Sequence, residues 1–320
     1  MSDVRHHNAE FTTTEAGMRL DQALAKIFSE YSRSSIKGWI ESGHVTVNAQ
    51  MCRPRYTVRT GDVVQLTAIL EAGKDLEPDV VDFQVVHADE DCIVVHKPVG
   101  CVVHPGAGNN RNTLANGLIQ NFPELAALPR AGLIHRLDKN TSGLLIVART
   151  SKAYQLLIKQ MAARGIKRIY DAVANGKFIS GGTIDAPIGR DPGNRTRMTV
   201  REGGRNAVTH YRITTKFRMH THLEVELETG RTHQIRVHLA HVGHPIVGDG
   251  RYGGRLLLPP QPHFELEDKL RHFPRQALHA RRLEFEHPIH STRISLKSPM
   301  PSDMRALLGA LATDLSALSD

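Results

Sequence analysis

The sequence has few cysteines and no long apolar run. Its three cysteines, Cys52, Cys92 and Cys101, are scattered along 320 residues. An odd, dispersed set fits neither a disulfide framework nor a paired zinc motif, so we expect reduced thiols. No apolar run reaches membrane-spanning length, and residues 1–17 lack the hydrophobic stretch of a secretory signal. We therefore expect a cytoplasmic protein with no membrane partner.

Motifs for bound cofactors and metals are also missing. The loop at residues 104–108 has two glycines but is followed by neither a Gly-Lys-Ser/Thr sequence nor a dinucleotide-binding repeat. The same absence argues against methyl transfer. His238, His241 and His244 do not have the spacing of a known zinc motif, and no cysteine or carboxylate converges on them in the sequence. We predict that no metal is bound.

Positive charge is concentrated in one part of the chain. Residues 130–251 contain 21 lysines and arginines against 9 aspartates and glutamates, a net charge of +12, which leaves −4 of the overall +8 for the rest. Such a basic region indicates an extended anionic partner, and RNA or DNA fits better than a small acidic metabolite. The alternative is a solvated surface that serves solubility.

Residues 17–74 are predicted to form a small module of two short helices followed by strands. The helices are indicated by apolar spacing, with Ser32 as a cap and Gly43 as a stop. The apolar positions are Leu20, Leu24, Ile27, Phe28, Ile36, Trp39 and Ile40. Acidic residues 75–82 complete a linker that begins near Glu71.

Residues 83–320 are predicted to form a larger domain that ends in a helix. A hairpin is expected at 83–86 and 92–96, and further strands at 166–175, 206–215 and 221–229. Helices are expected at 112–121, 151–163 and 231–242. The mixed order of elements predicts an α+β fold with a largely antiparallel sheet and flanking helices.

One carboxylate, Asp138, is isolated between cations ahead of a buried strand. Arg136 and Lys139 flank it, and the apolar run 144–148 follows a polar turn. Cationic neighbours favour the ionised form, which suits a nucleophile or a base. Asp residues in turns also commonly bind their own backbone. A calcium loop is excluded because Arg149 stands where the bidentate glutamate belongs.

Two other segments supply partners for such a carboxylate. Tyr170, on an expected strand, could stack on a nucleobase while its hydroxyl takes part in proton transfer. Arg231, at the start of an expected helix, could pair with Asp138. Each also has an ordinary interpretation, a core aromatic or a surface cation. The stretch 190–205 is predicted to be a basic hairpin that binds RNA backbone through Arg195, Arg197 and Arg205, or otherwise a soluble loop.

The N-terminal module resembles the S4 RNA-binding domain. The resemblance is carried by Arg19-Leu20-Asp21, Ser32-Arg33, the strand entry at 43–48 and Gly61-Asp62-Val63. It implies a small α/β domain in which Arg33 and Lys37 face the nucleic acid, beside the loop of Arg53 and Arg55. Charged residues on an exposed helix are otherwise usually only solvated.

From about Phe83 onwards the chain resembles the pseudouridine synthases of the RluA/RluC/RluD group. Five segments carry the resemblance: His135–Asp138 with Thr141–Leu144, Arg168–Val173, Gly230–His238, Gly248-Asp249 with Tyr252-Gly253, and Gln276–Ala280. With the S4 module and the loop 102–108, the chain is most similar to the type D members, which act on large-subunit ribosomal RNA. The segment 255–273 departs from the family pattern.

This resemblance implies an enzyme that isomerises uridine in 23S ribosomal RNA during ribosome assembly, without a cofactor. Asp138 would be the essential acidic residue, Arg231 its ion-pair partner and Tyr170 the residue stacked on the base. Arg136 would fill the space left by a flipped nucleotide. We expect a monomer whose partner is the RNA or a pre-ribosomal particle.

Two other classes of protein remain as alternatives. The first is a non-catalytic assembly protein, which would have no need of Asp138. The second is a glycoside or nucleoside hydrolase, which would normally require a second catalytic carboxylate in the matched segments.

Overall fold

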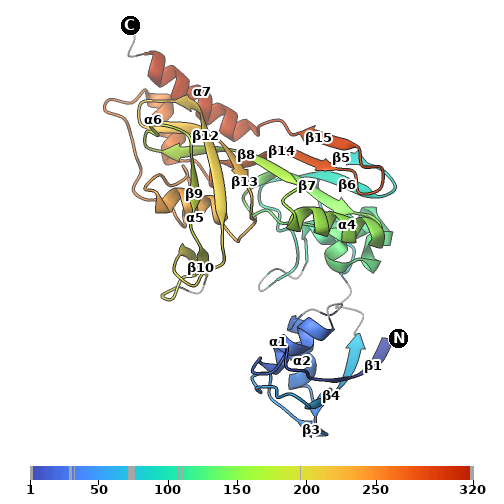
Figure 1. Ribbon diagram of the computed structural model, residues 1–320. Helices are drawn as coiled ribbons and strands as arrows, with labels where there is room; N and C mark the ends of the chain where they lie inside the picture. Colours follow the sequence, from blue (N-terminus) through green and yellow to red (C-terminus); the bar gives the residue numbers. More distant parts are fainter. Residues whose placement is uncertain are drawn as a thin grey trace. The chain divides into compact units, whose positions relative to one another are not determined.

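The structure, a computed structural model, describes residues 3–28, 31, 33–70, 76–106, 109, 111–194 and 196–317. It divides the chain into two compact units, Met1–Leu76 and Glu77–Asp320, both drawn in Figure 1. The boundaries expected from the sequence, at 17–74, 75–82 and 83–320, stay a prediction. Within the described ranges, every helix is too short or too polar to cross a bilayer.

The N-terminal unit is a four-stranded antiparallel sheet with two short helices. The strand order is β1–β4–β2–β3. Both helices and the entry into β2 fall where the apolar spacing predicts them, while the expected cap Ser32 lies outside the described residues. The elements are β1 (Asp3–Glu10), α1 (Leu20–Ile27), α2 (Arg33–Glu41), β2 (Val45–Val47), β3 (Gln50–Met51) and β4 (Val63–Leu70).

The sequence analysis missed β1. This strand pairs with β4 from Asp3 opposite Leu70 to Glu10 opposite Val63. Its sequence, Asp-Val-Arg-His-His-Asn-Ala-Glu, has no alternation of apolar and polar residues. Pairing along the full length of β4 stabilises the strand, and that pairing is not visible in the local sequence.

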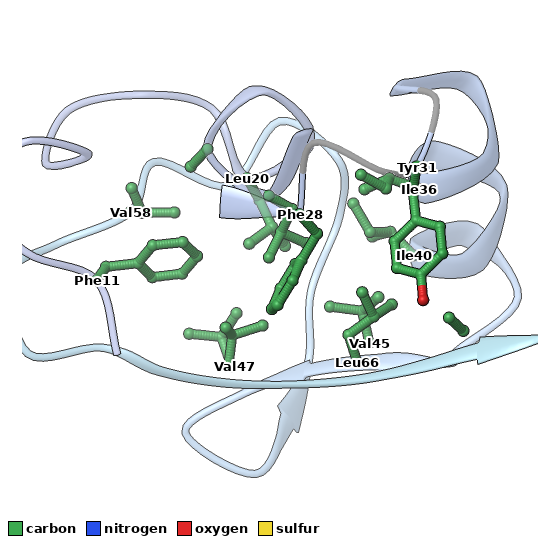
Figure 2. Packing of buried hydrophobic residues seen from close by; sticks show 14 residues of the cluster. Phe11, Leu20, Phe28, Tyr31, Ile36, Ile40, Val45, Val47, Val58 and Leu66 are labelled. Atoms are coloured by element: carbon green, nitrogen blue, oxygen red, sulfur yellow. The ribbon is translucent and has the colours of Figure 1, made fainter. Parts of the chain in front are cut away.

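The helices and the sheet of this unit enclose an apolar core (Figure 2). The picture shows helix side chains above the strand, with the rings of Phe11 and Phe28 over Val47. Burying one leucine or isoleucine side chain contributes about 1.5–3 kcal/mol. The unit therefore has a core of its own, which includes Phe11, Leu20, Leu24, Phe28, Ile36, Ile40, Val45, Val47, Val58 and Leu66.

A nine-stranded sheet forms the centre of the second unit. Its order is β5–β6–β7–β14–β8–β13–β12–β9, and β15 also pairs with β14. Neighbouring strands are antiparallel except β7 and β14, which are parallel. The strands are β5 (Gln84–Ala88), β6 (Cys92–Lys97), β7 (Ser142–Ala148), β8 (Lys167–Asn175), β9 (Gly182–Asp185), β12 (Val208–Lys216), β13 (His220–Leu227), β14 (Leu278–Glu286) and β15 (Arg293–Lys297). The predicted mixed, largely antiparallel sheet is confirmed.

Helices flank this sheet, and a hairpin projects from it (Figure 1). Ala153 and Leu157 of α4 share a core with Leu144 and Ile146 of β7. The hairpin consists of β10 (Ile188–Arg190) and β11 (Met198–Val200), paired antiparallel, and it overlaps the predicted basic stretch 190–205 from Arg190 onwards. The helices are α3 (Leu114–Asn121), α4 (Ser151–Ala162), α5 (Gln234–His241), α6 (Phe264–Arg271) and α7 (Ser302–Ser316).

Gly143 sets the spacing between β7 and β14. Every residue of β7 is buried, and Gly143 lies opposite Ala280 of β14. The φ angle of Gly143 is 119°, and a Cβ on it would lie 2.3 Å from the carbonyl oxygen of Ala280. Only glycine permits this conformation and this approach. Gly143 therefore fixes the strand that follows Asp138.

Replacing Gly143 by alanine is expected to lower the free energy of unfolding by about 2–4 kcal/mol, because the backbone of β14 must move. Gly309→Ala in α7 is the matched control, since a Cβ there meets nothing within 4 Å and alanine favours a helix. Chemical denaturation of both variants measures the difference. Equal stability of the two would contradict the role given to Gly143.

Candidate active site

Asp138 lies in the turn that leads into β7. Its backbone oxygen accepts a hydrogen bond from the N–H of Thr141 at 3.0 Å, which closes the turn. Its side chain is 16% exposed. The carboxylate thus occupies the expected strand-end position, with access to solvent, but it is more covered than a surface aspartate.

The cation that covers Asp138 is Arg236 of α5. Its Nη1 donates to Asp138 Oδ2 at 2.9 Å. Its Nε and Nη2 donate to the two oxygens of Asp249, at 2.7 and 2.8 Å. Burial alone would lower the pKa of Arg236, but hydrogen bonds and attraction from Asp249 and Asp138 raise it above its ordinary value. Arg236 is therefore a permanent cation beside the carboxylate of Asp138.

The ion pair predicted between Asp138 and Arg231 is wrong. Arg231 precedes α5, and its Nε donates to the backbone oxygen of Asn206 at 2.9 Å. Burial and the neighbouring charge of Arg205 lower the pKa of Arg231. The sequence segment 230–236 contains two arginines, and the helix begins only at Gln234, so the second one reaches the carboxylate. Whether Arg231 serves catalysis in another way stays a prediction.

Tyr170 lies on β8 and is buried, with 4% of its surface exposed. Burial raises the pKa of its hydroxyl, and the negative charge of Asp138 adds to that rise while Arg168 opposes it. Asp138 and Tyr170 thus lie close enough to interact electrostatically, and the phenol is protonated at neutral pH. The structure brings together these two of the three predicted catalytic residues.

Lys97 is a buried residue at this site to which the sequence analysis gave no role. It is 0% exposed, and its Nζ donates to the backbone oxygens of Pro98, Cys101 and Lys139 at 2.7–3.0 Å. Burial lowers the pKa of Lys97 to about 8. Because Lys139 follows Asp138 directly, this ammonium ties the catalytic turn to the loop after β6. The only feature of the sequence that could have indicated this role of Lys97 is its position at the end of an apolar strand, just before Pro98.

His233 and Tyr252 form a second group beside Asp138. His233 Nε2 lies 3.9 Å from Asp138 Oδ1, and His233 Nδ1 is hydrogen-bonded to Tyr252 Oη at 2.7 Å. The ring of Tyr252 lies 5.0 Å from the guanidinium carbon of Arg236 and 5.3 Å from that of Arg197. Tyr252 therefore links the catalytic cluster to the basic hairpin.

The residues predicted to bind RNA are exposed wherever the structure describes them. Arg136, Arg197 and Arg205 are exposed in the larger unit, and Arg195 lies outside the described residues. In the smaller unit Arg33 pairs with Asp21 at 2.7 Å, and Lys37 pairs with Glu41 at 3.4 Å. Exposure is consistent with RNA binding, which stays a prediction.

Two of the three histidines weighed as a metal cluster have other partners. His238 is hydrogen-bonded to Thr209 and Ala186, and His244 to Asn175. Two other groups bring ligand atoms within 4.8 Å: His87, Asp89 and Cys92, and Asp91, His287 and His290. In the first group, His87 and Asp89 are bonded to each other. In the second group, His287 Nδ1 accepts hydrogen bonds from the backbone N–H groups of Ile289 and His290. Both lie near the end of β7 farther from Asp138, since Cys92 pairs with Ala148.

Comparison with known proteins assigns this site to a family. Residues 91–241 match the model described as RNA pseudouridylate synthase, and residues 18–64 match that of the S4 domain. The ribosomal large subunit pseudouridine synthase D of Pseudomonas aeruginosa is 49% identical over 288 residues, 90% of each chain. This chain belongs to the RNA pseudouridylate synthase family. The resemblance expected from the sequence is confirmed.

Other relatives agree with this assignment. The ribosomal large subunit pseudouridine synthase D of Xanthomonas campestris is 50% identical over 299 residues, 93% of this chain and 90% of the relative. Among solved structures, human RNA pseudouridylate synthase domain containing 4 has a TM-score of 0.55 at 25% identity, over 72% of this chain and 93% of that one. Human RNA pseudouridylate synthase domain containing 1 has a TM-score of 0.53, also at 25% identity, over 68% and 83%.

Arg236→Lys is expected to slow pseudouridine formation by about a hundredfold, because one ammonium cannot bridge Asp138 and Asp249 as the guanidinium does. Arg231→Lys, which keeps that bridge, is expected to stay within a few-fold of the wild type. Single-turnover rates measure this, and thermal unfolding shows whether each variant is folded. The reverse order of the two rates would restore Arg231 as the partner of Asp138.

Proposed function

We propose that this pseudouridine synthase acts on uridines in large-subunit ribosomal RNA, with Asp138 as the reacting residue. The observation that carries the proposal is a solvent-accessible carboxylate held by Arg236 on one oxygen and free of a close hydrogen bond from His233 on the other. The relatives that match along most of this chain are named ribosomal large subunit pseudouridine synthase D, and this name indicates large-subunit ribosomal RNA as the substrate. The S4 unit and the basic segment are consistent with a large, structured nucleic acid.

The reaction rearranges bonds without adding or removing atoms overall. The bond between N1 and C1′ of uridine breaks, the uracil turns in the site, and C5 bonds to C1′. C5 then loses its proton, and N1 gains one. Asp138 can attack C1′ or remove a proton, and both roles require an ionised carboxylate.

Tyr170 and Arg136 complete this mechanism. Tyr170 is assigned to stacking on the uracil, which requires side chains that cover its buried ring to move aside, and its protonated hydroxyl can take part in proton transfer. Arg136 is exposed near the carboxylate, where it can fill the space of an extruded nucleotide. Extrusion costs a few kcal/mol of stacking and least in a loop, so a loop uridine is the expected target.

The cationic residues outside the cluster are assigned to RNA binding. Arg205 and Arg231 lie close enough for one charge to lower the pKa of the other, and two neighbouring guanidinium groups suit a phosphate. Arg197 extends this surface along the hairpin, and Arg195, which lies outside the described residues, is assigned to RNA binding from the sequence alone. In the S4 unit, Arg33 and Lys37 are exposed despite their carboxylate partners.

The proposal also covers how the protein works in the cell. It acts as a monomer in the cytoplasm, without a cofactor, on ribosomal RNA or a pre-ribosomal particle.

Asp138→Asn is expected to abolish isomerisation and to leave RNA affinity near that of the wild type, because shape and charge carry the binding. Isomerisation is measured by chemical mapping of pseudouridine in large-subunit RNA that was unmodified at the start, and RNA affinity is measured by filter binding. Asp268→Asn on α6, an exposed position, is the matched control. Normal turnover by Asp138→Asn would refute the assignment, and release of free uracil by the wild type would indicate a hydrolase.

Replacing Arg197, Arg201 and Arg205 together by alanine is expected to reduce the slope of log affinity against log salt concentration by about two, since each lost phosphate contact removes about 0.7–0.9. The control removes Lys269 and Arg271 from α6. An unchanged slope in the hairpin variant would make the hairpin a soluble loop with no role in binding.

A further inference from the structure

We infer that His233 and Tyr252 form a positioning pair for the isomerisation: Tyr252 fixes the hydrogen of His233 on Nε2, and this N–H orients the free oxygen of Asp138. The inference rests on the proposed function of Asp138. It is argued from the backbone of His233, the hydrogen bonds of Tyr252 and the geometry at Asp138.

The backbone of His233 is held in an uncommon conformation. Its φ and ψ angles are 58° and 22°, in the left-handed region, at the residue that caps α5. A non-glycine residue in that region is strained by about 1–2 kcal/mol and persists where the surroundings hold it. Here the surroundings are the first turn of α5, including Gln234 and Arg236, and the phenol of Tyr252. This backbone conformation directs the imidazole of His233 toward Asp138.

The hydrogen bonds of Tyr252 assign the tautomer of His233. The backbone N–H of Met198 donates to Tyr252 Oη at 3.0 Å. The phenol has one hydrogen of its own, and His233 Nδ1, at 2.7 Å, is the acceptor that the described contacts offer it. We therefore assign no hydrogen to His233 Nδ1 and place the hydrogen of the neutral ring on Nε2.

His233 is neutral at the pH of the cell. Burial lowers the pKa of the imidazole below its ordinary value, Arg236 and Arg251 lower it further, and the charges of Asp138 and Asp249 oppose them. With Tyr252 these are the charged and titratable groups that face the ring. A neutral donor does not neutralise the carboxylate as a second cation would.

The geometry at Asp138 separates the two oxygens. Oδ2 receives Nη1 of Arg236 at 2.9 Å, whereas Oδ1 lies 3.9 Å from His233 Nε2. The longer distance exceeds that of a hydrogen bond by about an ångström. The N–H dipole thus attracts Oδ1 and restricts rotation of the carboxylate without occupying the lone pair that reacts. Such preorganised donors are a main source of rate enhancement in enzymes.

Tyr252 also joins this pair to the hairpin. Met198 belongs to β11, and Arg197 next to it lies over the Tyr252 ring. Loss of the phenol hydroxyl therefore has two effects: it loosens the hairpin, and it frees His233 to place its hydrogen on either nitrogen. A double-mutant cycle separates the two, because only the second effect needs His233.

The first test compares two substitutions of His233. Asparagine tolerates the left-handed backbone and can accept the hydrogen of Tyr252, but it places no donor at Nε2. We expect His233→Asn to slow single-turnover pseudouridine formation on the order of tenfold to a hundredfold, with RNA affinity and melting temperature unchanged. His233→Gln carries an amide N–H near the position of Nε2 and is expected to recover at least several-fold of that loss.

The second test introduces Tyr252→Phe into the wild type and into His233→Asn. We expect a larger loss of rate in the wild-type background, because the tautomer matters only when His233 is present. A wild-type rate for His233→Asn, equal rates for the asparagine and glutamine variants, or the same loss in both backgrounds would each overturn the inference. A wild type that forms no pseudouridine in large-subunit RNA would instead overturn the proposed function.

Discussion

The active site depends on one buried guanidinium shared by two carboxylates. Asp249 binds Arg236 through both oxygens and also accepts the backbone N–H groups of Arg251 and Tyr252. The guanidinium is thus fixed by Asp249 and donates from Nη1 to Asp138. Unpairing a buried charge costs about 3–5 kcal/mol, so loss of either carboxylate would destabilise the fold as well as the reactive group. Arg236 holds one oxygen of Asp138 and leaves the other available for reaction.

The groups around this pair limit the movement of the catalytic turn. Lys97 binds the backbone on one side of Asp138, and Gly143 lets β14 approach β7 directly after the turn. Both act through backbone atoms. The carboxylate is therefore placed by packing and hydrogen bonding before any RNA arrives, which is what charge-based catalysis requires.

Local signals in the sequence predicted part of this site, and long-range contacts determined the rest. Asp138 was found because a polar turn between cations precedes an apolar run, and β7 follows directly from that run. Arg236 was not distinguished from Arg231, because residues 234–239 are all buried and the helix shows no polar face to set its orientation. Lys97 binds carbonyl oxygens, which leave no side-chain signature, and β1 is held by β4 rather than by its own apolar pattern. The left-handed backbone of His233 likewise has no local cue such as a glycine.

The order of strands in the large sheet has a consequence for biosynthesis. β14 lies between β7 and β8, although it is made long after both, and Arg236 is separated from Asp138 by 98 positions. Until β14 leaves the exit tunnel, the gap in the sheet stays open and β7 lacks its parallel neighbour. The nascent chain therefore carries an unassembled sheet beside the catalytic turn until β14 has been made.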